Sequence, residues 1–90
     1  MAVLMTADVP GQTREGYDGL LTALRDAIRA APGFIAHFAI VPSGDSWTVM
    51  EVWETQDDAN QFFATYVHPM LQEGIKPKRS FQSLHSLVRV

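Results

Sequence analysis

The spacing of apolar and polar residues predicts a strand and then a long helix in the first third of the chain. Residues 2–7 are apolar and free of Gly and Pro, as in a strand, and residues 8–11 break the pattern as a turn. From Tyr17 to Ala31, apolar residues recur every three or four positions with charged residues opposite, which predicts an amphipathic helix. Thr13 is its expected N-cap, and Pro32 and Gly33 end it.

The rest of the chain predicts a β-hairpin, a second helix and a last strand. Residues 34–41 and 46–54 have strand composition, and residues 42–45 form the turn between them. Thr55 is the expected N-cap of the second helix, which Pro69 must interrupt because proline removes a backbone donor. A linker at 76–79 precedes a strand at 80–90. The order β-α-β-β-α-β is that of the ferredoxin-like α+β fold, with an antiparallel sheet.

The hairpin is apolar on both faces, whereas a sheet with one face in water alternates apolar and polar residues. The first strand is expected to carry Phe34, Ala36, Phe38 and Ile40 on one face, opposite Ile35, His37, Ala39 and Val41. The second strand is expected to carry Thr48, Met50 and Val52 opposite Trp47, Val49, Glu51 and Trp53. In this topology both helices cover the same side of the sheet. We therefore expect a homodimer in which two sheets pack face to face.

Composition supports that expectation and excludes several classes of protein. Ninety residues fit a single domain, 1–90, and a chain of this size buries only about two-thirds of its unfolded surface. A hydrophobic content of 47% then leaves apolar surface for a partner. The net charge of −3 gives no support to nucleic-acid binding, and the absence of Cys excludes disulfides and thiolate metal sites. No apolar run approaches membrane-spanning length, no metal-ligand spacing is present, and a cytoplasmic location is expected.

Several segments resemble the antibiotic biosynthesis monooxygenase family over nearly the whole chain. They are Pro-Gly-Phe-Ile-Ala-His at 32–37, Val-Trp-Glu-Thr at 52–55, the Phe pair at 62–63, and a final strand with His85. The resemblance implies a dimeric α/β barrel with a pocket between sheet and helices in each subunit. A fold match alone does not assign a reaction.

The resemblance implies several alternative activities. Some members of the family oxidise polyketide aromatics to quinones with molecular oxygen and no metal or flavin, whereas others degrade heme, or isomerise, cyclise or decarboxylate small molecules. Heme degradation uses an Asn in the first strand, a Trp in the second helix and a His near the end of that helix. Here those helix positions hold Phe62 and Gln72, and the first strand has no Asn, so heme degradation is not expected.

His85 and His37 are the candidate acid/base residues, because histidine titrates unaided near neutral pH. Either one, facing a pocket, could take a phenolic proton and leave an anion electron-rich enough to reduce oxygen. The alternative for each is a hydrogen-bonded core residue. A two-residue hairpin loop would pair His37 with Met50, and a three-residue loop would pair it with Glu51. Glu51 could orient a His or act as a base, or it could lie on a wet edge or pair with Arg89.

The candidate substrate-binding residues are the bulky side chains of the hairpin and of the second helix, together with the third His. They are Trp53, Phe62, Phe63, Tyr66, Met50 and His68. Core packing is the alternative for the aromatic ones. The basic cluster from Lys76 to Arg79 could attract an anionic substrate at the pocket mouth, or be a solvated linker.

The expected function is cofactor-independent oxygenation of a small apolar, aromatic or polyketide-like molecule by a homodimer. Two alternatives stay open on the same fold. One is a non-oxidative cyclase or isomerase that uses the same His residues, and the other is a non-catalytic ligand-binding or stress-response dimer.

Overall fold

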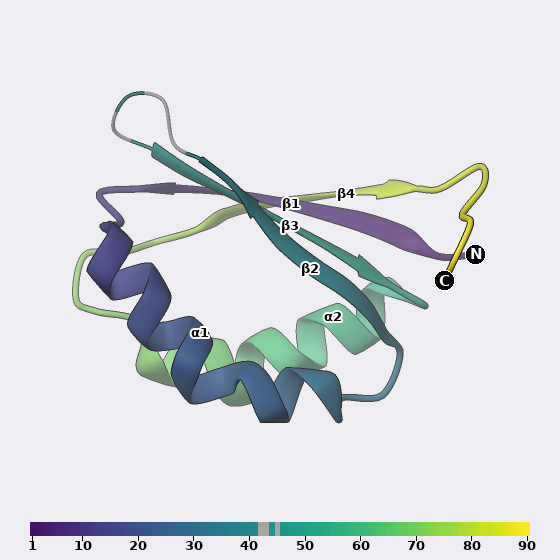
Figure 1. Cartoon of the computed structure of the whole chain (residues 1–90), viewed down its shortest axis with the longest axis horizontal. Helices are drawn as coiled ribbons and strands as arrows, with labels where there is room; N and C mark the ends of the chain where they lie inside the picture. The colour runs from purple at the N-terminus through teal and green to yellow at the C-terminus, as the bar shows by residue number, and fades with distance from the viewer. Residues whose placement is uncertain (42–43, 45) are drawn as a thin grey trace.

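The computed structural model of the chain describes residues 1–41, 44 and 46–90, so the turn expected at 42–45 lies largely outside the described residues. The elements are β1 (Val3–Pro10), α1 (Arg14–Arg29), β2 (Phe34–Ile40), β3 (Ser46–Trp53), α2 (Gln56–Phe62), the π-helical turn η1 (Phe63–Val67), the 3₁₀ turn η2 (His68–Met70) and β4 (Lys78–Ser83). The strands form one antiparallel sheet in the order β2-β3-β1-β4. Both helices lie against the same face of it (Figure 1). The predicted ferredoxin-like α+β fold is confirmed.

The helices begin where the sequence predicts. The Thr13 hydroxyl accepts a hydrogen bond from the backbone N–H of Gly16 at 3.0 Å, and Thr55 does the same for Asp58 at 3.0 Å. Gly33, with φ +81°, turns the chain out of α1, and a side chain there would run into the Asp58 carboxylate. Glycine is therefore required where the end of α1 passes the start of α2.

The final strand differs from its prediction. β4 runs from Lys78 to Ser83 instead of over residues 80–90. Lys78 and Arg79, which were predicted to belong to the linker, are therefore the first two residues of the strand. The reason is its neighbour: β4 is an edge strand that pairs only with β1, and Ser83 already lies opposite Val3, where β1 begins. One more bond, from the Leu84 N–H to the Ala2 carbonyl, ends the ladder. Residues beyond it have no strand to pair with.

A register irregularity in β2 also corrects the predicted faces of the hairpin. The pairing with β3 shifts between Phe34 and Ala36, so Phe34 lies opposite Trp53 and packs on it edge to face at 5.4 Å. Phe34 therefore joins the core under the helices, whereas Ala36 and Phe38 belong to the other face. The predicted sharing of one face by Phe34 and Phe38 is wrong.

The core lies between the sheet and the helices in two clusters. One is built on β1 and Trp47 of β3, and the other on Ile28, Trp53, Ala59 and Phe62. The opposite face, the outer face, is formed by Leu4, Thr6, Asp8, Ala36, Phe38, Ile40, Thr48, Met50, Val52, Lys78, Ser80 and Gln82. No helix covers this face (Figure 1), and Phe38 and Ile40 are 45% and 49% exposed. Among the described residues, no helix is long and apolar enough to cross a bilayer.

Candidate functional site

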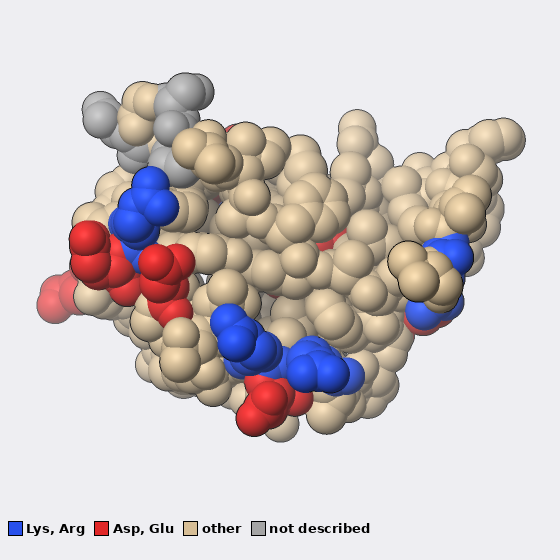
Figure 2. Space-filling view, in the orientation of Figure 1, with Lys and Arg blue, Asp and Glu red and all other residues tan. Residues whose placement is uncertain are grey.

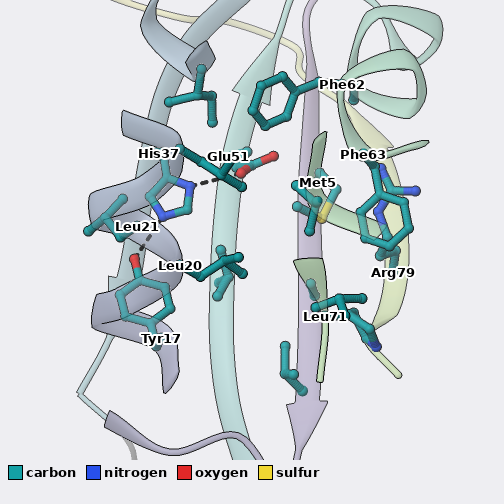
Figure 3. Close-up of a pocket in the computed structure, with 18 of the residues that line it drawn as sticks. Met5, Tyr17, Leu20, Leu21, His37, Glu51, Phe62, Phe63, Leu71 and Arg79 are labelled. Atoms are coloured by element: carbon teal, nitrogen blue, oxygen red, sulfur yellow. Dashed lines mark hydrogen bonds and ion pairs between the residues drawn. The ribbon is translucent and has the colours of Figure 1, made fainter. Parts of the chain in front are cut away.

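A cavity of about 100 Å³ lies between the sheet and the helices and opens to solvent at its mouth. Its wall is mostly aliphatic and aromatic, with side chains from all four strands, both helices and the segment before β4 (Figure 3). The polar side chains of the lining are Gln12, Tyr17, His37, Glu51 and Arg79. An apolar cavity with a few converging polar groups is the usual form of a small-molecule site.

Four of the side chains at this site form a continuous hydrogen-bonded chain. The Tyr17 hydroxyl lies 2.7 Å from Nε2 of His37, and Nδ1 of His37 lies 2.8 Å from Oε2 of Glu51 (Figure 3). The other carboxylate oxygen of Glu51 accepts a hydrogen bond from the Trp53 indole N–H at 2.9 Å. The side chains of His37 and Glu51 are only 17% and 12% exposed, which shields the pair from water.

The register of the hairpin brings His37 and Glu51 together. His37 of β2 lies directly opposite Glu51 of β3, so of the two pairings that the sequence left open, the one with Met50 is wrong. Glu51 also does not pair with Arg89, which instead bonds Glu54 at 3.0 Å. Among the interpretations given for Glu51, the geometry favours the orientation of a histidine, because its carboxylate is hydrogen-bonded to Nδ1 of His37.

Tyr17 belongs to the apolar face predicted for the first helix, where the sequence indicates a core residue. Its ring stacks on Trp47 at 5.0 Å and, more distantly, on His37 at 6.1 Å. Burial raises the pKa of the Tyr17 phenol, and the negative charges of Glu51 and Asp18 raise it further. The apolar spacing of the helix predicted its inward direction correctly. Only the pairing of the strand across from it shows that its hydroxyl meets a histidine.

Arg79 of β4 is a partly buried cation on the opposite side of the cavity. Its guanidinium lies 4.2 Å from the centre of the Phe63 ring and 5.2 Å from that of Phe81. Nη1 donates to Asn60 at 3.1 Å, whereas Nε is buried and has no hydrogen-bond partner among the described residues. Burial lowers the pKa of Arg79, and the charge of Glu51 opposes that shift.

Among the candidate substrate-binding residues, Phe62 and Phe63 line the cavity. Trp53 is completely buried behind the wall, where it packs on Phe62 at 5.7 Å and holds Glu51. Tyr66 stacks on the outer side of Phe62 and is 45% exposed. Neither Trp53 nor Tyr66 belongs to the lining, so their predicted contact with a substrate has no geometric support.

Three further candidates lie away from the cavity. Met50 points to the outer face, because it pairs with Thr6 and Phe38 in the alternating sheet. His68 is exposed in the 3₁₀ turn that Pro69 enforces. His85 is exposed in the segment after β4, since the strand that was to carry it inward ends at residue 83. His37 is therefore the one predicted acid/base residue on the cavity wall.

Among residues 1–41, 44 and 46–90, no group of three or more His, Asp or Glu side chains is placed to hold a metal ion. Tyr17, His37 and Glu51 instead satisfy one another by hydrogen bonds. The arrangement is suited to accepting, holding and returning a proton at a site largely shielded from water.

Fold and cavity together define a ferredoxin-like α+β protein with an internal apolar cavity between sheet and helices. The family model of the antibiotic biosynthesis monooxygenases matches residues 1–73, and the chain belongs to this family. No curated protein sequence matches closely enough to add to this assignment.

Solved structures share the fold at low sequence identity. One is SnoaB of Streptomyces nogalater, described as a cofactor-independent oxygenase, at TM-score 0.74 and 12% identity over 97% of this chain and 96% of that one. Another is NE2512 of Nitrosomonas europaea, of unknown function, at TM-score 0.75 and 10% identity over 97% and 92%. The monooxygenase ActVA-Orf6 of Streptomyces coelicolor, solved with nanaomycin D, gives TM-score 0.60 and 14% identity over 97% and 90%.

Proposed function

We propose that the chain is a cofactor-independent oxygenase that takes a proton from a small aromatic molecule bound in the cavity. The observation that carries this proposal is the His37–Glu51 pair, hydrogen-bonded at 2.8 Å on the wall of an apolar cavity. Removal of a phenolic proton gives an anion that passes an electron to molecular oxygen. Recombination at a ring carbon and loss of water then convert phenol and oxygen to quinone and water. The shared fold with SnoaB, described as a cofactor-independent oxygenase, supports this reaction class.

The wall supports an aromatic or polyketide-like substrate. Phe62 and Phe63 offer aromatic surface on one side, and Leu20 and Leu21 offer aliphatic surface on the other (Figure 3). The strand of His37 and the strand of Arg79 are the two edges of the sheet, so their backbones lie about 14 Å apart at the usual strand spacing. We therefore propose a flat substrate of two or three fused rings, bound between the acid/base group at one edge and the cation at the other.

The direct test is oxygen uptake with a dihydroxynaphthalene. The native protein is expected to consume oxygen and form the quinone, and His37→Gln is expected to lower the turnover number about 10²- to 10⁴-fold, the usual contribution of general-base catalysis. His85→Gln is the matched control, because it removes an exposed imidazole outside the cavity. An equal loss in both variants, or no uptake by the native protein, would contradict the proposal.

Arg79 is expected to hold an anionic oxygen of the substrate, because its buried Nε–H has no partner among the described residues. Arg79→Met should weaken binding of 1-hydroxy-2-naphthoate about 10- to 100-fold, the usual loss of a hydrogen bond to a charged group, and leave 1-naphthol binding nearly unchanged. Calorimetric titration measures both affinities. Lys78→Met removes a cation from the exposed neighbouring position and is the control. Equal affinities for the carboxylate in native and Arg79→Met protein would reject this role.

A non-oxidative isomerase or cyclase is the second candidate, because the same hydrogen-bonded pair can move protons without any oxidant. It would convert its substrate at full rate under anaerobic conditions, whereas the oxygenase would stop. The cavity also suits a non-catalytic ligand-binding protein, for which His37→Gln would change affinity and no turnover would be found.

We also propose that two copies of the chain associate through the outer face and that the protein works in the cytoplasm. The outer face presents Phe38 and Ile40 to solvent and lies opposite both helices (Figure 1). In the view of Figure 2, Lys, Arg, Asp and Glu gather over the helices and at the ends of the molecule. The half of the outer face formed by β2 and β3 is mostly apolar, with Phe38, Ile40 and Met50, and an apolar surface of this kind is complementary to itself.

A further inference from the structure

Both ring nitrogens of His37 are occupied, and this limits how the histidine can meet a substrate. Nδ1 is hydrogen-bonded to the Glu51 carboxylate, and Nε2 is hydrogen-bonded to the Tyr17 hydroxyl. A carboxylate only accepts, so Nδ1 carries the hydrogen of its bond, and Nε2 of the neutral ring accepts the phenolic hydrogen of Tyr17. A substrate hydroxyl therefore finds no free lone pair on His37.

The oxygen of Tyr17 does retain free acceptor capacity. A phenol donates one hydrogen and still accepts through its lone pairs, and Tyr17 belongs to the cavity lining. We infer that Tyr17 is the catalytic residue that contacts the substrate hydroxyl, and that His37 and Glu51 act through it as a proton relay. This inference rests on the proposed function and names the group that touches the reacting atom.

The step balances without any further reactant. The substrate O–H bond breaks and its proton passes to the Tyr17 oxygen, while the Tyr17 proton passes to Nε2 of His37. The products are a substrate phenolate, a neutral Tyr17 and an imidazolium that faces the Glu51 carboxylate. Glu51 stabilises that imidazolium, and the Trp53 N–H holds its second oxygen in place at 2.9 Å. Return of the proton runs along the same path in reverse.

Packing holds Tyr17 in the position that this step requires. Its ring lies between α1 and the sheet and is stacked on the buried Trp47 with an interplanar angle of 18°. Burial raises the pKa of Tyr17, so the resting hydroxyl keeps the hydrogen that it donates to His37. Tyr17 thus neither swings out of the cavity nor loses its proton before a substrate arrives.

The test compares the two tyrosines of the chain in the full-length protein. Tyr17→Phe removes one hydroxyl and keeps the stacking ring, and Tyr66→Phe makes the same change at an exposed position outside the cavity. The probe is 1-naphthol under anaerobic conditions, whose bound phenolate is recognised by its red-shifted absorption. Circular dichroism establishes that each variant is folded.

The relay predicts that native protein and Tyr66→Phe bind 1-naphthol as phenolate, and that Tyr17→Phe binds it as the neutral phenol with affinity changed less than about tenfold. With dihydroxynaphthalene and oxygen, kcat of Tyr17→Phe should fall about 100-fold or more, with KM little changed. If His37 were the direct base, loss of the Tyr17 hydroxyl would free Nε2 and phenolate would still form, which overturns the relay. The relay is also overturned if the native protein binds 1-naphthol as the neutral phenol or does not bind it at all. A phenolate in the native protein without oxygen uptake would instead reject the oxygenase and keep the relay.

Discussion

Replacing Trp53 with Ala is expected to lower the free energy of unfolding by about 3–5 kcal/mol, the range for removal of a large aromatic side chain from a packed core. Trp53 is the one described side chain with no exposed surface. Its ring packs between those of Phe34 and Phe62, with ring centres 5.4 Å and 5.7 Å away. Its loss opens a cavity under the hairpin and leaves Oε1 of Glu51 without its donor. Because small domains have about 5–15 kcal/mol of stability in total, this variant should lie near the edge of folding.

Trp53→Phe separates packing from hydrogen bonding in that effect. It retains an aromatic ring and removes the indole N–H, so a smaller loss of about 1–2 kcal/mol is expected. Tyr66→Ala, at an exposed position, should cost less than about 1 kcal/mol. Thermal unfolding followed by circular dichroism ranks the three variants, at roughly 4–8 °C for each kcal/mol. A Trp53→Ala protein as stable as Tyr66→Ala would show that the hairpin does not depend on this indole.

The fold could be predicted from the sequence because its determinants are local. Thr13 and Thr55 are the N-caps of the two helices, as the sequence predicts. Gly33, with positive φ, turns the chain after the first helix, also at the predicted position. The end of the final strand could not be predicted, because it depends on where its partner begins: Ser83 stops pairing at Val3, at the other end of the chain.

The candidate site was only partly predictable, because its polar groups are brought together by register. A shift of one residue in the pairing register of the hairpin would have placed Met50 instead of Glu51 beside His37. Tyr17 gave no separate signal, since a tyrosine on the apolar stripe of a helix has the same spacing as a core residue. Its hydroxyl became informative only once His37 was found across from it at 2.7 Å.

Dissociation of the proposed dimer is the other large effect that we expect. Phe38→Asp should raise the dimer dissociation constant about 10³-fold or more. Removal of an interfacial aromatic anchor costs about 2 kcal/mol or more, and a two-fold interface contains it twice. Phe38 is the aromatic side chain of the outer face, and its neighbour Ile40 is equally exposed. Sedimentation equilibrium at micromolar concentration should give twice the chain mass for the native protein and the chain mass for the variant.

The matched control is Thr22→Asp, which adds the same charge at an exposed position on α1, away from the outer face, and should leave the dimer intact. A native protein that sediments as a monomer would reject the interface outright.

The same measurement decides why the hairpin is apolar on both faces. Phe38 and Ile40 lie opposite the cavity side of the sheet and contribute nothing to its wall, so no ligand explains them. In the proposed dimer a second sheet would cover this face and remove them from water, and the loss of that burial is what Phe38→Asp measures.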